Sequence, residues 1–333
     1  MNGVIMMVIA IVVLGGGYLF YGRYLEKKWG IDPNAKTPAY ELEDGVDYVP
    51  ADTNIVFGHQ FASIAGAGPI NGPIQAAIFG WLPVLLWILI GGVFFGAVQD
   101  FASMYASVKN KGRTIGYIIE EYIGKLGKKL FLLFCWLFCI LVVAAFADVV
   151  AGTFNGFVAD DAGVVSKVAA NGAVATTSML FIVEAVALGC ILKYAKLNKW
   201  VNTAIAIVML VAAVALGLYF PMYLTRETWH ILIFIYILIA SVAPVWALLQ
   251  PRDYLNSYLL IFMIVGAVIG VFVANPACNL KPFTSFNVNG QYMFPILFVT
   301  IACGAVSGFH SLVSSGTASK QIKNEKNMLP VSF

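Results

Sequence analysis

Charged residues are scarce in this sequence. Asp, Glu, Lys and Arg together make up 11% of its 333 residues, whereas a soluble domain is roughly a quarter charged. Hydrophobic residues make up 60%, and the mean hydropathy is +0.85. This composition excludes an ordinary soluble domain. It predicts an all-α polytopic membrane protein, because the hydrophobic residues occur in runs of roughly 20, the length of a membrane-spanning helix.

Cysteine is also rare. The five cysteines lie almost entirely within apolar runs, at Cys135, Cys139, Cys190, Cys278 and Cys303. A disulfide framework is therefore not expected, and the i, i+4 pair Cys135 and Cys139 is interpreted as apolar packing rather than a metal site. No His/Cys/Asp cluster has the spacing of a metalloenzyme, so we expect no metal cofactor and no prosthetic group.

The common nucleotide motifs are missing as well. Gly66-x-Gly68-x-x-x-Gly72 has neither the dinucleotide-binding spacing nor the Gly-Lys-Ser/Thr of a phosphate loop. Basic residues form no soluble face with interleaved aromatics, which excludes nucleic acid as a partner. The first apolar run, residues 3–21, lacks the basic n-region and cleavage site of a signal peptide, so it is predicted to be a spanning helix. These absences favour a protein that is not an enzyme.

About nine apolar runs are long enough to be transmembrane helices. They lie at approximately 3–21, 55–79, 82–108, 130–157, 173–192, 200–220, 230–249, 255–275 and 292–313. When these runs alternate across a bilayer, 17 of the 20 Lys and Arg residues fall on one side. Basic loops stay cytoplasmic, so the N-terminus is predicted to be outside and the C-terminus cytoplasmic. On the cytoplasmic side we expect a polar loop at 22–54 and an interfacial amphipathic helix at 115–126.

The second run contains a helix break. Between residues 66 and 73 it holds three glycines and two prolines that a helix interior tolerates poorly. In lipid a broken helix is allowed only where protein or a polar cavity surrounds it, so this stretch is the predicted substrate site. A second proline-containing stretch occurs in the seventh run. The candidate substrate-binding residues are His59, Gln60, Ser63, Gly66, Gly68, Asn71, Pro244 and Trp246.

Ionisable residues within spans are costly and usually functional. Asp100, Asp148, Glu184 and His310 are therefore candidates for a proton relay or a coupling-ion pathway, and His59 is a further histidine within a span. A structural role is the alternative for each: Asp100 can reach the membrane interface, and a lone histidine can bond a backbone carbonyl.

Serines in the ninth run form another candidate site. Ser311, Ser314 and Ser315 offer hard oxygen ligands for a small cation, with Na⁺ at Ser314 and Ser315 as the specific hypothesis. Interhelical hydrogen bonds are the alternative role for the same hydroxyls. The coupling ion thus stays open between H⁺ and Na⁺.

Four separated motifs resemble the carbon starvation protein A (CstA) family. They are residues 53–80, 96–100 (Gly-Ala-Val-Gln-Asp), 250–256 (Gln-Pro-Arg-Asp-Tyr-Leu-Asn) and 307–321 (Ser-Gly-Phe-His-Ser-Leu-Val-Ser-Ser-Gly-Thr-Ala-Ser-Lys-Gln). The resemblance implies an inner-membrane transporter for peptides or pyruvate, linked to the carbon-starvation response. It also implies a LeuT-like core of two inverted five-helix repeats, with the broken first helix of each repeat at the substrate site.

In that core, residues 1–54 are a leading helix and loop, 55–220 the first repeat, and 230–333 a partial second repeat within a single transmembrane domain. Ten core helices would need two more spans than the nine counted, so we expect a C-terminally truncated chain that self-associates or pairs with a missing segment. The predicted function is a secondary active transporter that imports a small carboxylate such as pyruvate, or peptides. The alternatives are a membrane substrate sensor or signalling subunit, and a non-transporting fragment of a transporter.

Overall fold

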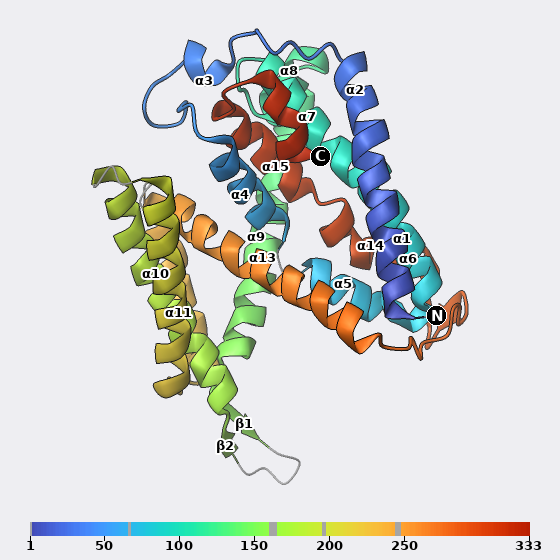
Figure 1. Ribbon diagram of the computed structural model, residues 1–333, viewed down its shortest axis with the longest axis vertical. Helices are drawn as coiled ribbons and strands as arrows, with labels where there is room; N and C mark the ends of the chain where they lie inside the picture. Colours follow the sequence, from blue (N-terminus) through green and yellow to red (C-terminus); the bar gives the residue numbers. More distant parts are fainter. Residues whose placement is uncertain (1, 66–67, 160–164, 195–197, 244–247) are drawn as a thin grey trace. The chain divides into compact units, whose positions relative to one another are not determined.

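The chain forms two compact units, which are treated one at a time. The computed structural model describes residues 2–65, 68–159, 165–194, 198–243 and 248–333. Unit 1 comprises Met1–Lys128 and Leu259–Phe333, and unit 2 comprises Lys129–Tyr258. Figure 1 shows that almost every element is a helix. Two short antiparallel hairpins complete the described elements: β1 (Phe157–Ala159) with β2 (Val165–Lys167), and β3 (Asn287–Val288) with β4 (Gln291–Tyr292).

Long apolar helices confirm that this is a polytopic membrane protein. Within the described residues, six helices are long and apolar enough to span a bilayer. They cover Gly3–Lys28, Trp81–Lys109, Lys125–Phe154, Ala169–Ile191, Trp200–Tyr219 and Pro251–Ala274. The second and ninth predicted runs each form two shorter helices, and the seventh forms a helix of 17 residues, α12 (Arg226–Val242). The total of nine spans and the LeuT-like arrangement stay predictions.

Unit 1 contains the N-terminal helices and the C-terminal segment from Leu259 onward. The first span consists of α1 (Gly3–Gly16), a π-helical turn and α2 (Arg23–Lys28), and another consists of α6 (Trp81–Gly91), a second π-helical turn and α7 (Val98–Lys109). Three further helices of unit 1 are short: α3 (Pro38–Glu41), α8 (Ile115–Tyr122) and α16 (Met328–Ser332). The predicted amphipathic helix at 115–126 is therefore shorter than expected, because Gly124 adopts φ +110° and ends it.

Unit 2 is built from long helices. These are α9 (Lys125–Phe154), α10 (Ala169–Tyr194), α11 (Lys199–Tyr219) and α12, with α13 (Leu249–Ala274) beginning in this unit. Phe154 and Trp229 pack edge to face with ring centroids 5.0 Å apart at one buried cluster. Leu188, Ala206 and Leu255 form a second buried cluster. Aliphatic and aromatic packing of this kind joins membrane helices where lipid supplies no hydrophobic drive.

The predicted break in the second run is confirmed, and its position is now known. The helix α4 (Thr53–Ile64) ends at Ala65, whose φ of −81° and ψ of 51° are not helical. The helix α5 then runs from Gly68 to Ala76. Pro69 and Pro73 lie inside α5 and do not interrupt it, contrary to the expectation from sequence. Pro69 falls in the first turn, where a backbone N–H has no helical partner to lose.

A second broken helix lies opposite the first within unit 1. The helix α14 (Met293–Ala305) ends at Val306, with φ −147° and ψ 67°, and α15 (Gly308–Gly316) follows. The helix α5 packs against α14, and α4 packs against α15. Because each half of one broken helix contacts a half of the other, the two breaks lie together (Figure 1).

The basic segments of unit 1 meet at one end of it. Lys320 lies 3.4 Å from the Asp47 carboxylate, and the backbone N–H of Asp32 donates to Glu325. At the other end, Gly3 N–H donates to Pro276 O and Trp81 N–H to Lys281 O. Figure 1 places α2, α3, α8 and the C-terminus together, away from the N-terminus. These contacts agree with the predicted sidedness of the loops, while the identity of the cytoplasmic side stays a prediction.

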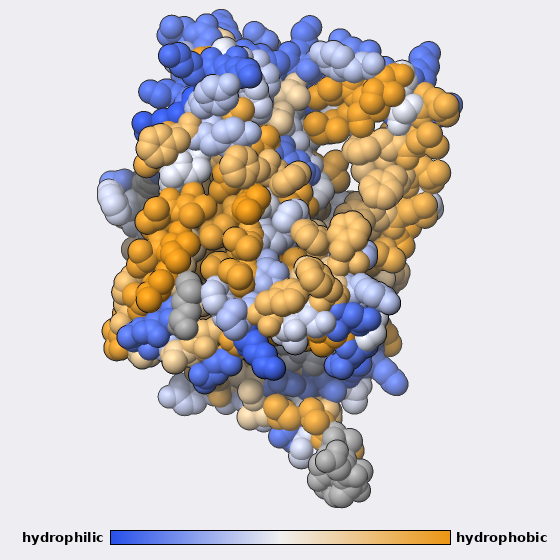
Figure 2. Space-filling model, turned by 90° about the vertical axis from the view of Figure 1, so that its right-hand side faces the viewer, coloured by the Kyte–Doolittle hydropathy of each residue, from blue (hydrophilic) through white to orange (hydrophobic). Residues whose placement is uncertain are grey.

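Much of the surface of unit 1 is apolar. On α1, Ile5, Ile11 and Val12 are each more than half exposed. Figure 2 shows a broad hydrophobic region below the hydrophilic residues at the top of this side of the molecule. Exposed aliphatic side chains on a helix of spanning length are what lipid contact requires.

A buried ion pair holds the C-terminal segment of unit 1 in place. Glu325 is 3% exposed, and both its oxygens accept from Lys109 Nζ at 2.8 and 2.9 Å. We expect Glu325→Gln to lower the free energy of unfolding by about 2 kcal/mol, because the Lys109 ammonium keeps its charge and loses the carboxylate that balances it. Thermal unfolding in detergent measures the change. Lys323→Gln, at an exposed position on the same segment, is the control, and an equal shift in both variants would contradict the prediction.

Candidate functional site

The helix α15 presents a polar face next to its break. Ser307 caps this helix, since its side chain accepts the backbone N–H of Phe309 at 3.3 Å. His310 and Ser314 are four residues apart and therefore lie on the same side of the helix. Both are buried. The break thus begins a short helix whose inner side carries an imidazole and a hydroxyl.

Gln60 on α4 contacts this face directly. Its Nε2 donates to Ser314 Oγ at 2.7 Å and to the carbonyl oxygen of His310 at 3.5 Å. The Gln60 side chain is fully buried, and its Oε1 has no hydrogen-bond partner in the structure as described. An unpaired buried amide oxygen costs roughly 1–3 kcal/mol. Gln60 therefore both joins the two broken helices and leaves one acceptor unused.

Asp100 on α7 completes the cluster. Its Oδ2 lies 3.6 Å from His310 Nδ1, and both side chains are 6% exposed. This distance is longer than a hydrogen bond but within the range of an ion pair. A carboxyl and an imidazole buried together within a membrane span are costly, and such groups are rare outside pathways for ions or protons. We call Gln60, Asp100, His310 and Ser314 the buried polar cluster.

The other serines of this region make interhelical or local hydrogen bonds. Gln99 Nε2 on α7 donates to Ser311 Oγ at 3.3 Å and to Ser307 O at 3.5 Å. Ser107 Oγ bonds the carbonyl oxygen of Ser315 at 2.8 Å. Gln99 thus reaches the break itself. The Ser311 and Ser314 hydroxyls thus take part in hydrogen bonds between helices, whereas Ser315 offers its carbonyl oxygen and its hydroxyl bonds Leu312 O within α15. None of these bonds tests a Na⁺ site at Ser314 and Ser315.

The remaining substrate-site candidates are spread over the first broken helix. Ser63 Oγ donates to the carbonyl oxygen of His59 within α4 at 2.8 Å. Gly68 is the first residue of α5, and Asn71 is exposed on the same helix. Gly66, Pro244 and Trp246 lie outside the described residues. The break near Pro244 that sequence pairs with the first break is therefore untested, and α12 ends at Val242 shortly before it.

Two of the candidate carboxylates belong to unit 2. Asp148 accepts from Arg226 Nη2 at 2.6 Å with both its oxygens and lies 3.1 Å from His230 Nε2. Neither partner was predicted from sequence, although His230 begins the seventh predicted run and Arg226 lies four residues before it. Glu184 on α10 is half-buried, and its Oε2 has no hydrogen-bond partner among the described residues. The structure thus gives Asp148 a charged partner and leaves one oxygen of Glu184 without a hydrogen bond.

Comparison with known proteins identifies the family. The sequence profile described as "Carbon starvation protein CstA" matches residues 2–333. The chain belongs to the CstA family. Its relatives include "Peptide transporter CstA" of Escherichia coli strain K12, 36% identical over 92% of this chain and 44% of the relative. No solved structure matches.

Two further relatives are similar to most or all of this chain. "Peptide transporter CstA" of Bacillus subtilis strain 168 is 36% identical over 100% of this chain and 55% of the relative. "Pyruvate/proton symporter BtsT" of Escherichia coli strain K12 is 36% identical over 92% of this chain and 43% of the relative. The chain thus spans about half the length of these relatives. Membership of the CstA family and the apolar helices together support a multi-pass membrane protein.

Proposed function

We propose that this chain carries the substrate and proton site of a secondary active transporter that imports a small carboxylate such as pyruvate, or a peptide, across the inner membrane. The observation that carries the proposal is the buried polar cluster, which lies beside two adjacent helix breaks. Transporters place substrate and coupling-ion sites at broken helices near the middle of the bilayer. The names of the relatives supply the substrate classes: peptides for two of them and pyruvate with a proton for the third.

The substrate carboxylate is proposed to bind at the breaks themselves. The helices α5 and α15 both begin there, at Gly68 and Gly308. Their first backbone N–H groups have no partner within the helix, and the positive end of a helix dipole favours an anion. The unused Oε1 of Gln60 would accept from a protonated group of the substrate.

A proton is the coupling ion that the buried polar cluster favours. Asp100 and His310 can each take up and release a proton, and they lie within ion-pair distance. The hydroxyl of Ser314 already accepts from Gln60, so only one lone pair of its oxygen remains for a Na⁺ ion. Glu184 in unit 2 is the competing proton site, because a half-buried carboxyl oxygen without a hydrogen-bond partner is also expensive.

Uptake into proteoliposomes tests the proposal. We expect labelled pyruvate or a labelled dipeptide to accumulate when an inward proton gradient is imposed, and not when an equal sodium gradient replaces it. Empty liposomes and a proton-conducting ionophore are the controls. Binding of either substrate without gradient-driven accumulation would favour a sensor instead, and accumulation driven by sodium alone would overturn the proton site.

A further inference from the structure

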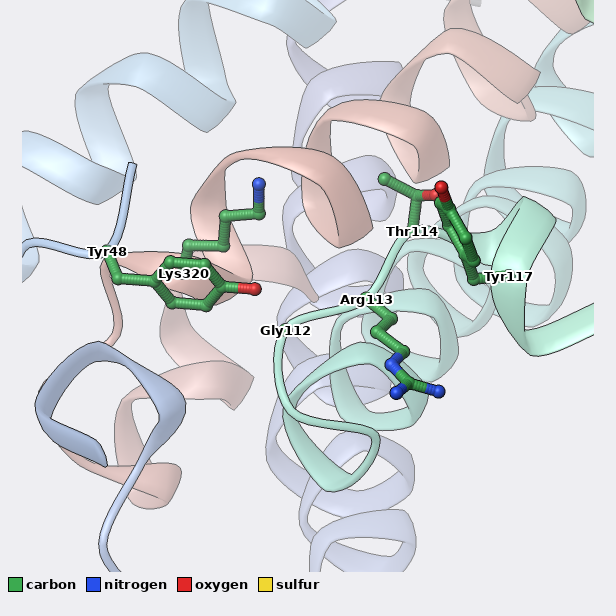
Figure 3. Close-up of a pocket in the computed structure, with 6 residues that line it drawn as sticks. All are labelled: Tyr48, Gly112, Arg113, Thr114, Tyr117 and Lys320. Atoms are coloured by element: carbon green, nitrogen blue, oxygen red, sulfur yellow. The ribbon is translucent and has the colours of Figure 1, made fainter. Parts of the chain in front are cut away.

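A cavity separate from the buried polar cluster opens at the basic end of unit 1. It has a volume of about 450 Å³ and is lined by Tyr48, Gly112, Arg113, Thr114, Tyr117 and Lys320. Figure 3 shows Tyr48 and Lys320 on one side of it, Thr114 and Tyr117 on the other, and the loop of Gly112 and Arg113 between them. Three stretches far apart in the sequence thus contribute to one cavity with two cationic side chains.

Close packing and hydrogen bonds fix the loop at the base of this cavity. Gly112 has φ +69°, and a Cβ there would approach Tyr48 Cε1 to 2.8 Å, so that only glycine fits. The Tyr48 hydroxyl donates to the carbonyl oxygen of Lys111 at 3.1 Å. The carbonyl oxygen of Arg113 accepts from the buried Ser107 hydroxyl at 2.8 Å. The cavity is therefore preformed, with its aromatic wall fixed against the loop.

The wall that carries Tyr48 is ordered by an acidic turn. Asp44 Oδ1 accepts the backbone N–H groups of Val46, Asp47 and Tyr48 at 2.8–2.9 Å. These bonds, chiefly the one from Val46, lower the pKa of the Asp44 carboxyl below its ordinary value. The carboxyl is therefore ionised at neutral pH and keeps the hydrogen bonds that form the turn. The same turn holds the exposed Asp47 carboxylate 3.4 Å from Lys320 Nζ.

The charges around the cavity favour an anion. Lys320 lies over the Tyr48 ring, 5.1 Å from its centroid, and its ionic partner Asp47 is exposed, so this carboxylate can be displaced at modest cost. Arg113 is exposed at the opposite side of the loop. Lys128 is bound to Glu120 and adds a cation next to Tyr117, 3.8 Å from the ring centroid. A phosphate group is the anion that such Lys and Arg side chains recognise best.

A lipid is the source of phosphate that this position favours. The amphipathic helix α8 begins at the cavity, directly after Thr114. At its last residue and just beyond it, the apolar side chains are 71–75% exposed, at Tyr122, Ile123 and Leu126. Exposed apolar residues beside a basic site at the end of a membrane helix are suited to acyl chains next to a headgroup. A soluble phosphate compound would make no use of this apolar surface.

We propose that this cavity binds the phosphate headgroup of an anionic phospholipid, and that α8 and the residues after it contact the acyl chains of the same lipid. The lipid would join the loop before α8 to the segments that carry Tyr48 and Lys320. Because these segments pack on the basic end of unit 1, the lipid would stabilise that end. This site is independent of the proposed substrate and of transport.

Native mass spectrometry of the full chain in detergent tests the proposal, with dioleoyl phosphatidylglycerol as the probe and dioleoyl phosphatidylcholine as the zwitterionic comparison. We expect the double variant Arg113→Gln, Lys320→Gln to bind phosphatidylglycerol about thirtyfold more weakly, since two basic residues near an anionic lipid contribute about 1 kcal/mol each and about 1.4 kcal/mol is a factor of ten in affinity. The matched control is Lys323→Gln, Lys326→Gln, which removes the same charge from exposed positions of the same end. Equal weakening in both double variants would overturn the site in favour of general surface attraction.

Two further measurements keep the test decisive. Asp47→Asn frees Lys320 from its carboxylate and should strengthen phosphatidylglycerol binding, so a loss of binding would contradict the proposal even if the double variant folds poorly. Inorganic phosphate and glycerol 1-phosphate are added as competitors. If either displaces the lipid at equal concentration, the cavity is a site for soluble phosphates and the lipid assignment fails.

Discussion

Replacing Asp100 with Asn should reduce proton-driven uptake to the level of empty liposomes while leaving substrate exchange intact. The amide has nearly the shape of the carboxyl, so the contact with His310, 3.6 Å away, is kept in geometry. Unlike the carboxyl, the amide cannot take up a proton near neutral pH. Accumulation against a gradient needs that proton, whereas exchange of labelled for unlabelled substrate moves no net proton.

The two activities are measured on the same proteoliposomes. Uptake is recorded after an imposed inward proton gradient, and exchange is recorded with equal pH and equal substrate on both sides. Asp100→Glu keeps an ionisable group in a buried position and should recover part of the uptake. Proton-driven uptake by Asp100→Asn at the rate of the unmodified chain would remove Asp100 from the mechanism.

A matched variant in unit 2 separates the two proton sites. Glu184→Gln removes the other carboxyl that has an oxygen without a hydrogen-bond partner, and it should leave proton-driven uptake largely intact. If instead Glu184→Gln abolishes uptake and Asp100→Asn does not, the relay lies in unit 2. Thermal unfolding of each variant confirms that the loss is not one of folding.

The sequence identified the broken helix because glycine and proline are local signals. The positions of the prolines did not predict where the helix breaks. The break falls at Ala65, and Pro69 and Pro73 are helical. A proline in the first turn of a helix loses no hydrogen bond, so only knowledge of where α5 begins could show that Pro69 starts a helix rather than ends one. The second break, at Val306, was not predicted, because the ninth run was interpreted as a candidate cation site.

The sequence could not predict which side chains of different helices contact each other. Asp100 and His310 were both named as costly residues in spans, but they are 210 residues apart, and no local pattern joins them. Gln60 was named at the substrate site, whereas its bond to Ser314 links the two broken helices. His230 was missed because it falls at the predicted start of a span, where a histidine is unremarkable until Asp148 is found next to it. Tertiary packing decides each of these contacts.

Gly72→Val should destabilise unit 1 more than any other single glycine substitution in α5. A Cβ at this position would overlap the carbonyl oxygen of Thr300 and come within 3.3 Å of Ile301 Cα. Both atoms belong to the backbone of α14, so neither can move aside as a side chain would. Forcing α5 and α14 apart also opens the buried contacts around Ile301 and Phe79. We expect the free energy of unfolding to fall by about 3 kcal/mol, the upper part of the range for overpacking.

Thermal unfolding in detergent, followed by tryptophan fluorescence, measures this effect. Trp87 reports on the region because it packs edge to face on Phe298 of α14 with centroids 4.8 Å apart. Gly15→Ala is the control, since nothing lies within 4 Å of a Cβ at that position, and a helical alanine is favoured over glycine by about 1 kcal/mol. An unchanged midpoint for Gly72→Val would show that α5 and α14 can separate freely. The two breaks would then not be held together by this contact, and the buried polar cluster would lose the scaffold that its proposed role requires.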